Sequence, residues 1–475
     1  MNRLRYFLVS FGILLCIGAC DDLFDDELPP HKLVGENAIT DEISAEGALL
    51  GIYSYLDQFG IWDSYYIVDN DLRLGFLEGS YRTVFEEQLR KLEVQQSVLD
   101  LRTVWVSCAQ MVNAANNFIY YVERLPKDKF GDGKQKEMLG EAKFMRAFAQ
   151  LRILKMFGHF WDINSEFGVL MRREPSMLSN NQMARSTVRE TYRLILEDLD
   201  AAIKDAPDFY SVFRACKVSA KAFKAEVLMM RGDEQDYEDA KQLATEVLKS
   251  TEFCMEEDFK SIFENGYKSS ELLFSRSLGS KSLAQAETNV PSMVKMFGGT
   301  YTPSATYYQI LNEHDARFKL TFDSVLYTPI NAKEKSLVWK KLWKSSKDTP
   351  MYYMRLAQMY LIRAEALIYT GATAKEVIDE LNILRLRSGN VELLVDDYPT
   401  RNCLLDIVFN EYVREIGMEN GSEYFVAVRM KKTGGIRKIQ EYNLNFEEDI
   451  QLNMPIPEEE LQYNLLMKQS PIYSK

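Results

Sequence analysis

Most of the chain after Ile43 repeats apolar residues with the period of an α-helix. The clearest case is EAKFMRAFAQLRILKMFG at residues 141–158, in which every third position is apolar: Ala142, Met145, Phe148, Leu151, Leu154 and Phe157. Phe144 and Ile153 add apolar surface on another side of the same helix. A helix that is apolar on more than one side packs between other helices, so this segment is predicted to lie in the centre of a helical core.

Three stretches of the sequence predict pairs of antiparallel helices, at residues 104–158, 219–250 and 355–389. The first helix of each pair is closed by a helix-breaking residue: Pro126, Gly232 and Gly371. Small residues stand where the helices would touch: Ala220, Ala222, Ala225, Ala357, Ala364 and Ala366. This pattern predicts a mainly α fold with degenerate tetratricopeptide-type helical pairs, too widely separated for a regular solenoid.

Between the second and third pairs the sequence changes character. Clusters of Gly, Ser, Pro and Thr surround short apolar runs such as LLFSRSL and KSLVWKKLWK. We expect loops and short strands here, on a helical frame, and such segments often carry a binding function. The predicted organisation is a signal peptide at 1–19, a lipidated acidic tether at 20–40, helical parts at 41–270 and 351–475, and a loop-rich binding segment at 271–350.

The first twenty residues, MNRLRYFLVSFGILLCIGAC, are typical of a bacterial export signal. Arg3 and Arg5 precede an apolar run at 7–17 that is shorter than the ~20 residues needed to span a bilayer. The closing Ile-Gly-Ala-Cys matches a lipoprotein cleavage site, and an ordinary secretory peptide with a chance cysteine is the alternative. Acylation of Cys20 would anchor the chain on a membrane through the solvated acidic segment that follows. An acidic run in this place resembles the surface-export signal of Bacteroidetes lipoproteins, and this resemblance implies the outer membrane and the cell surface.

The composition excludes some function classes. A net charge of −13 and a pI near 5.1 argue against nucleic-acid binding, which needs clustered Lys and Arg. Four cysteines stand singly in the predicted mature chain and favour buried thiols over disulfides: Cys108, Cys216, Cys254 and Cys403. With three histidines and no evident catalytic or phosphate-binding motif, the sequence predicts no enzyme, metal or cofactor, and His159 is expected to be structural.

Several segments, in order along the chain, resemble the SusD/RagB family of nutrient-binding lipoproteins. They are AITDEISAEGALLGIYSYL, WVSCAQMVNAAN, GEAKFMRAFAQLRILKMFG, RSTVRETYRLILEDLDAAIKDAP, MRLAQMYLIRAEALIYTG with ELNILRLRSG, and NMPIPEEELQYNLLMKQSP. The resemblance covers more than 400 residues. It implies a SusD-like fold, binding of oligosaccharide or sometimes peptide, and a SusC-like TonB-dependent outer-membrane transporter as partner.

The sequence departs from the family pattern in EYVREIGMENGSEYFVAVR. Tyr412 and Glu423 each stand for an arginine, Asn420 is inserted, and Val426 replaces an aspartate. Gln358, Leu465 and Ser470 are smaller departures elsewhere. These changes predict that a structural ion-pair network has been lost in this chain.

Two regions combine aromatic faces, which cover the apolar side of a sugar ring, with groups that pair sugar hydroxyls. The first lies at residues 61–82 and the second in the irregular middle segment. The candidate ligand contacts are Trp62, Tyr65, Tyr66, Asp69, Asn70, Asp71, Arg73, Tyr81, Tyr301, Tyr307, Tyr308, Trp339 and Trp343. For each aromatic residue ordinary core packing is the alternative. The resemblance places family ligand contacts in about these regions without fixing individual residues.

The leading hypothesis is therefore a non-enzymatic surface lipoprotein that captures glycan and closes over a TonB-dependent transporter. A peptide cargo for the same transporter is the main alternative. A protein-interaction scaffold without a small ligand, and a glycoside hydrolase using two carboxylates, are two further hypotheses.

Overall fold

The computed structural model describes residues 38–58, 60–79, 84–95, 99–276, 301–326, 335–339, 341 and 350–474. Cys20, the predicted signal peptide and all but the end of the predicted tether lie outside these residues, as do Tyr81 and Trp343. In the part of the chain that is described, no helix is both long and apolar enough to cross a bilayer.

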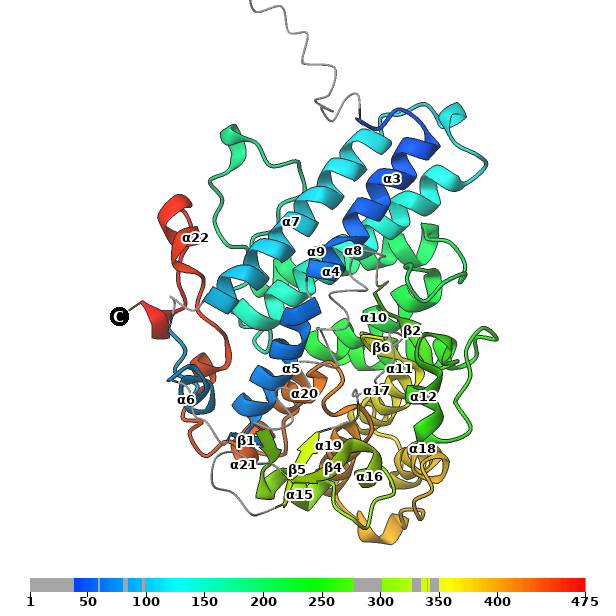
Figure 1. Cartoon of the computed structure of the whole chain (residues 1–475), viewed down its shortest axis with the longest axis vertical. Coiled ribbons are helices and arrows are strands. Elements are labelled where there is room, and N and C mark those ends of the chain that lie inside the picture. The colour runs from blue at the N-terminus through cyan, green and yellow to red at the C-terminus, as the bar shows by residue number, and fades with distance from the viewer. Residues whose placement is uncertain are drawn as a thin grey trace, which may run out of the picture.

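Helices build most of the molecule (Figure 1). In the first half they are α3 (Glu42–Tyr53), α4 (Tyr55–Gln58), α5 (Gly60–Leu74), α6 (Val84–Lys91), α7 (Leu99–Val122), α8 (Lys134–Phe157), α9 (Val188–Asp205), α10 (Lys217–Arg231), α11 (Glu234–Leu248) and α12 (Phe259–Asn265). In the second half they are α15 (Ala305–Ile310), α16 (Phe318–Thr321), α17 (Leu356–Tyr369), α18 (Ala374–Arg387), α19 (Arg401–Ile416), α20 (Ser422–Arg429), α21 (Ile439–Tyr442) and α22 (Glu458–Tyr463).

The predicted helical pairs are confirmed as α7 with α8, α10 with α11, and α17 with α18. Helix α8 packs against α3, α7 and α9 and is buried on several sides, as its apolar pattern predicts. Gly232 and Gly371 end the first helices of the later pairs with φ of 69° and 78°, a left-handed conformation that favours glycine. The six predicted contact alanines are all fully buried, so small side chains do bring these helices close together.

Short strands form in the irregular middle segment, as expected, and pair in antiparallel fashion with one another or with strands outside that segment. The strands are β1 (Leu77–Gly79), β2 (Leu272–Phe274), β3 (Tyr301–Pro303), β4 (Phe322–Leu326), β5 (Lys335–Trp339) and β6 (Met354–Arg355). They pair as β1 with β3, β2 with β6 and β4 with β5. The short helices α15 and α16 in the same segment were not predicted from the sequence.

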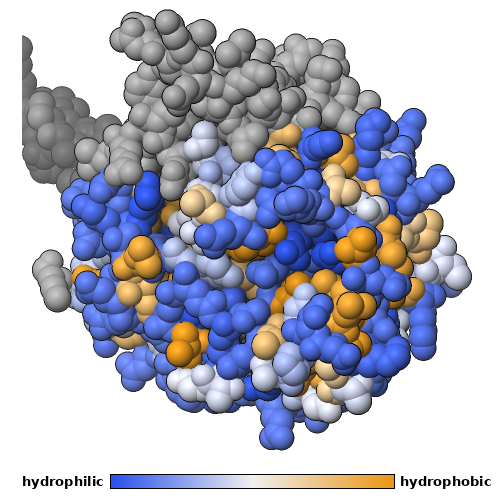
Figure 2. All heavy atoms as spheres, turned by 90° about the horizontal axis from the view of Figure 1, so that it is seen from below, coloured by the Kyte–Doolittle hydropathy of each residue, from blue (hydrophilic) through white to orange (hydrophobic). Residues whose placement is uncertain are grey.

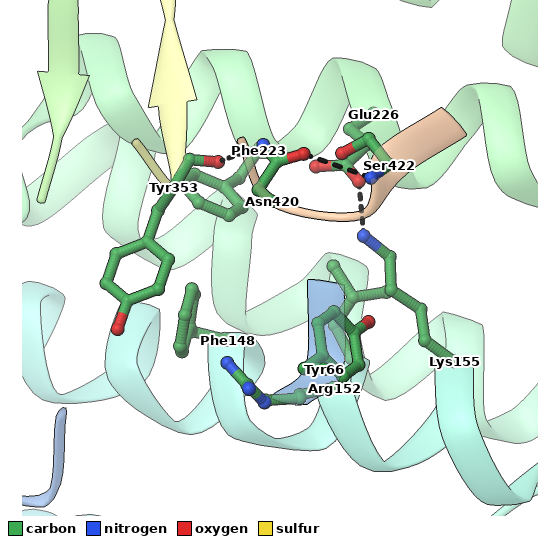
Figure 3. Close-up of a pocket in the computed structure, with 10 residues that line it drawn as sticks. Tyr66, Phe148, Arg152, Lys155, Phe223, Glu226, Tyr353, Asn420 and Ser422 are labelled. Atoms are coloured by element: carbon green, nitrogen blue, oxygen red, sulfur yellow. Dashed lines mark hydrogen bonds and ion pairs between the residues drawn. The ribbon is translucent and has the colours of Figure 1, made fainter. Parts of the chain in front are cut away.

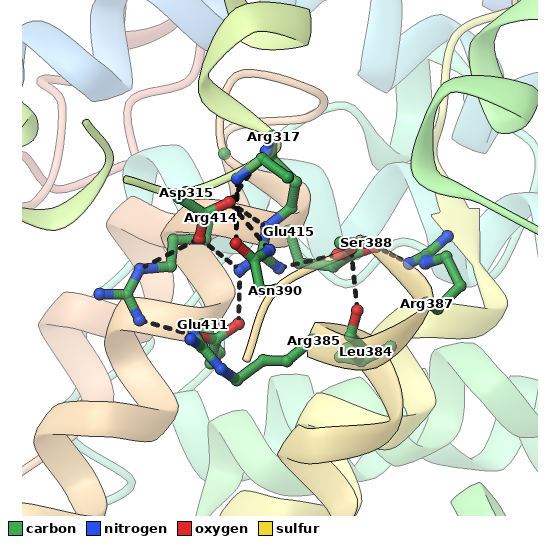
Figure 4. A network of polar contacts seen from close by, with 12 residues as sticks. Asp315, Arg317, Leu384, Arg385, Arg387, Ser388, Asn390, Glu411, Arg414 and Glu415 are labelled. Carbon is green, nitrogen blue, oxygen red and sulfur yellow. Dashed lines mark hydrogen bonds and ion pairs between the residues drawn. The ribbon is translucent and has the colours of Figure 1, made fainter. Parts of the chain in front are cut away.

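A buried ion-pair network joins β6, α18, α19 and the segment before α16, and Figure 4 shows its part around α18 and α19. Its cations include Arg317, Arg355, Arg385, Arg387 and Arg414, and its anions are Glu271, Asp315, Glu411, Glu415 and Glu419. The prediction that such a network is lost was therefore wrong. Glu411 and Glu415 of α19 pair with arginines from other elements, and Glu411 also pairs with Arg414 of the same helix. Tyr412, in place of an arginine, donates to Glu365 over 3.2 Å.

None of the four cysteines in the described part of the chain forms a disulfide. Cys108 and Cys216 are buried as predicted. Cys254 is exposed and Cys403 is half-buried, so the prediction of a buried thiol was wrong for Cys254 and Cys403. His159 is buried after the end of α8 and stacks on Trp161 at 5.1 Å. Burial, followed by the nearby Arg185 charge, lowers the pKa of His159 to about 4. A neutral, buried ring agrees with the structural role expected for it.

Candidate functional site

The predicted polar contacts on α5 are mostly buried. Asn70, Asp71 and Arg73 expose at most 2% of their surface. The Arg73 guanidinium lies 4.2 Å from the Tyr424 ring centroid and donates to the Leu452 carbonyl oxygen over 2.6 Å. These residues join α5 to the C-terminal part of the fold, so the burial contradicts the prediction that they contact a ligand. The sequence could not show this because their partners lie more than 300 residues away.

The second predicted region gives a mixed result. Tyr307 on α15 is fully buried and meets Phe76 and Phe322 edge to face, at 5.1 and 5.5 Å between ring centroids. It is therefore a core residue and not a ligand contact. Tyr308 is half-buried, and its hydroxyl donates to Glu313.

The remaining candidates keep the status of predictions. Trp62 and Tyr65 lie on α5, Tyr301 on β3 and Trp339 on β5, and the structure describes only the backbone at these positions. Asp69 is half-buried on α5. Tyr81 and Trp343 fall outside the described residues.

Tyr66 is the predicted contact that lines a pocket (Figure 3). The pocket lies where α5, α8, α10, the segment before β6 and the start of α20 meet. Its lining residues are Tyr66, Phe148, Leu151, Arg152, Lys155, Phe223, Glu226, Tyr353, Asn420 and Ser422. We call it the Tyr66 pocket.

Local contacts hold the polar groups of the Tyr66 pocket in place. The Arg152 guanidinium lies 4.5 Å from the Tyr66 ring centroid, a cation–π contact. Lys155 forms an ion pair with Glu226 of α10. The Asn420 amide donates to the Tyr352 and Tyr353 carbonyl oxygens over 3.1 and 3.3 Å. These bonds hold the loop before α20 against the segment before β6, so the pocket wall is fixed before any ligand arrives.

The pocket offers an aromatic ring, a guanidinium, an ammonium, a carboxylate and an amide within one small area. Sugar recognition uses this combination. The cavity measures about 50 Å³, which is room for one or two water molecules or a single small polar group. It can hold a substituent of a ligand, and a whole sugar ring would have to lie outside its mouth.

A larger groove runs between α11, α17 and α18, with a volume of about 600 Å³. Lys241, Lys249 and Arg363 face Glu376, Asp379 and Glu380 across it, together with Gln242, Thr245, Glu246 and Leu367. Arg363 of α17 donates to Glu380 of α18 over 2.7 Å. Among the described residues, none that lines the groove is aromatic, so this lining lacks the flat apolar face that a sugar ring packs against.

The face seen from below is covered mainly by hydrophilic residues, with hydrophobic ones in small groups (Figure 2). Within the described residues, no cluster of three or more His, Cys, Asp or Glu side chains could hold a metal ion.

Sequence reasoning missed Arg152, Lys155 and Glu226 as pocket residues. A signal was present, since Arg152 and Lys155 are cations three residues apart in the otherwise apolar end of α8. Buried cations need partners, which marks such positions as structural or functional sites. The Glu226 partnership depends on how α8 packs against α10, which the sequence alone does not give.

Two family models match the chain. One, described as "Starch-binding associating with outer membrane", matches residues 79–229. The other, described as the "SusD family", matches residues 331–473. SusD-like protein P2 of Formosa agariphila is 23% identical over 521 residues, covering 99% of this chain and 100% of that protein. A SusD-like protein of Bacteroides ovatus is 22% identical over 268 residues, which span 54% of this chain and about half (46%) of that relative.

Solved structures show the same fold. A SusD superfamily protein of Bacteroides thetaiotaomicron aligns with a TM-score of 0.77 and 20% identity, covering 91% of this chain and 100% of the other. Another, from Bacteroides vulgatus, aligns with a TM-score of 0.74 and 20% identity over 92% and 100% of the two chains. The two family models together cover more than half of the sequence, and the fold agrees over nearly all of it. The chain therefore belongs to the SusD/RagB family, whose members are nutrient-binding proteins associated with the outer membrane.

Proposed function

We propose that this chain is a cell-surface lipoprotein that captures oligosaccharide or polysaccharide fragments and delivers them to a SusC-like TonB-dependent transporter. It acts as a binding protein, with no catalytic step of its own. The observation that carries this proposal is the family membership over most of the chain. The Tyr66 pocket supports it, because it places an aromatic ring beside fixed polar groups.

Replacing Tyr66 by alanine is expected to weaken glycan binding about tenfold, or roughly 1.4 kcal/mol, because Arg152 loses the ring that holds its guanidinium at the pocket. Calorimetry and affinity electrophoresis over neutral and acidic polysaccharides measure the change. Tyr463→Ala removes an exposed tyrosine on α22 and should leave affinity unchanged. The proposal fails if no glycan binds the unmodified chain and pull-downs from the outer membrane recover no transporter.

A peptide cargo is the second candidate. The groove between α11, α17 and α18 favours it, since its opposed charged walls suit an extended polar chain better than a sugar. The same calorimetry with a tryptic peptide mixture separates the two candidates, because a peptide ligand would bind with unchanged affinity to the Tyr66→Ala variant and a glycan would not.

Acylation of Cys20 gives a separate prediction. Cells supplied with labelled palmitate should incorporate label into the unmodified chain, and Cys20→Ala should abolish incorporation and release the protein from the membrane fraction. Cys254→Ala removes an exposed thiol of the folded part and should change neither result. Equal labelling of the unmodified chain and Cys20→Ala would show that the anchor lies elsewhere.

A further inference from the structure

Asp71 on α5 and Glu423 on α20 form a buried pair of carboxyl groups. Both residues are fully buried, and their side chains hydrogen-bond to each other. One Glu423 oxygen also accepts from the Met418 amide over 2.7 Å. Apart from this mutual contact, no donor in the described structure reaches either Asp71 oxygen or the second Glu423 oxygen. Two carboxyl groups can bond to each other only if one of them carries a proton, so the pair holds a proton.

The surroundings do not replace that proton. Lys341 is the nearby cation, and it is already bound to Glu419 at 2.7 Å and to the carbonyl oxygens of Glu415 and Gly417 at 2.8 and 3.0 Å. Tyr307 of α15 faces the pair, and burial together with the Asp71 and Glu423 charges keeps its phenol neutral. Burial, followed by the Glu423 charge, raises the pKa of Asp71 well above its ordinary value, and Lys341 only opposes this shift.

We propose that Asp71 and Glu423 form a proton-operated clamp between α5 and α20. With one proton the pair is a hydrogen bond that joins the two helices. Without it, two buried carboxylates repel each other and separate the helices. Because Tyr66 of α5 and Ser422 of α20 both line the Tyr66 pocket, the clamp sets the shape of that pocket according to the external pH.

The sign of the pH effect follows from the raised pKa. A carboxyl group whose pKa is higher in the folded than in the unfolded chain stabilises the fold fully below the unfolded value. It loses this contribution as the pH rises through the folded value. The clamp is therefore closed in acid and weakens toward alkaline pH.

Hydrogen exchange of the full chain between pH 5 and 9 tests the clamp. After correction for the intrinsic exchange rate, the opening equilibrium constant of the amides in α5 and α20 should rise about tenfold per pH unit above the pKa of the Asp71–Glu423 pair in the folded chain. This slope is expected for one linked proton. Helices α9 and α18 of the same molecule provide the reference, and the corrected exchange of their amides should not change with pH. Asp71→Asn supplies a permanent donor and should abolish the slope in α5 and α20, whereas Asp379→Asn, in an exposed pair on α18, should keep it.

The proposal is overturned if α5 and α20 of the unmodified chain show no slope, or if the slope persists in Asp71→Asn. Glu423→Gln provides the same test should Asp71→Asn fail to fold. If neither variant folds, urea unfolding of the unmodified chain decides. A urea concentration at the unfolding midpoint that falls as the pH is raised from 6 to 9 supports the clamp. A midpoint concentration that does not change with pH contradicts it. None of these readouts depends on a ligand, so they stand apart from the test of glycan capture.

Discussion

Replacing Glu415 by glutamine is expected to lower the free energy of unfolding by about 3–5 kcal/mol, the usual cost of removing one partner from a buried ion pair. Glu415 is fully buried on α19. One of its oxygens accepts from Arg355 at 2.9 Å and from Arg387, and the other accepts from Arg317 at 3.1 Å. A neutral amide would leave these guanidiniums short of one negative charge in a site that water does not reach.

The same substitution should change how the free energy of unfolding depends on pH in acid. Burial alone would raise the pKa of Glu415, but the guanidiniums of Arg387, Arg355 and Arg317 outweigh it and hold the pKa far below its ordinary value. A carboxylate with a lowered pKa stabilises the fold fully above its unfolded pKa, near 4, and loses this contribution as the pH falls. Glu415 thus acts opposite to Asp71, which stabilises the fold on the acid side.

Urea unfolding at pH 7 measures the effect of Glu415→Gln, with Asp379→Asn as the control. Asp379 pairs with Lys375 on the surface of α18, where both side chains are more than half exposed, so its loss should change stability by less than about 1 kcal/mol. A Glu415 variant as stable as the control would show that the network contributes little to folding. Unchanged m-values would confirm that both variants unfold from a similarly compact native state.

The helical frame could be predicted from the sequence because its signals are local. The three helical pairs, their glycine or proline breaks and their contact alanines depend on residues within about 50 positions of one another. The helical period of the apolar residues and the glycine or proline residues at the turns indicate such contacts directly. The short strands of the middle segment also followed from local composition, although α15 and α16 did not, since both are only a few residues long.

The candidate site could be predicted only in part because its partners come from distant segments. Of residues 61–82, Tyr66 lines a pocket, and its contact with a ligand stays a prediction. On the same helix, Asp71 is buried and contacts Glu423, which lies about 350 residues later in the chain. The sequence pattern marked Glu423 as unusual without showing its partner. The same limit explains the ion-pair network, because Arg317 lies 94 residues before Glu411 and Arg355 lies 60 residues before Glu415.

Replacing Gly140 by alanine is expected to destabilise the chain by about 2–3 kcal/mol, although alanine is the better helix former by about 1 kcal/mol. Gly140 lies in α8 where the end of α9 crosses it. An added Cβ would lie 2.4 Å from the Ala206 backbone nitrogen and 2.8 Å from the Ala206 Cα. Backbone atoms cannot rotate away as a flexible side chain can, so α8 and α9 would have to move apart. This contact also explains why a glycine begins the segment GEAKFMRAF.

Gly47→Ala provides the matched control, because Gly47 lies on the exposed face of α3 and an added Cβ there meets nothing within 4 Å. The same chemical change should then stabilise the chain by about 0.4–1 kcal/mol, because alanine lowers the conformational entropy of the unfolded chain. Thermal unfolding of both variants should therefore give shifts of opposite sign. If Gly140→Ala raised the midpoint as Gly47→Ala does, the close approach of α8 and α9 would be contradicted.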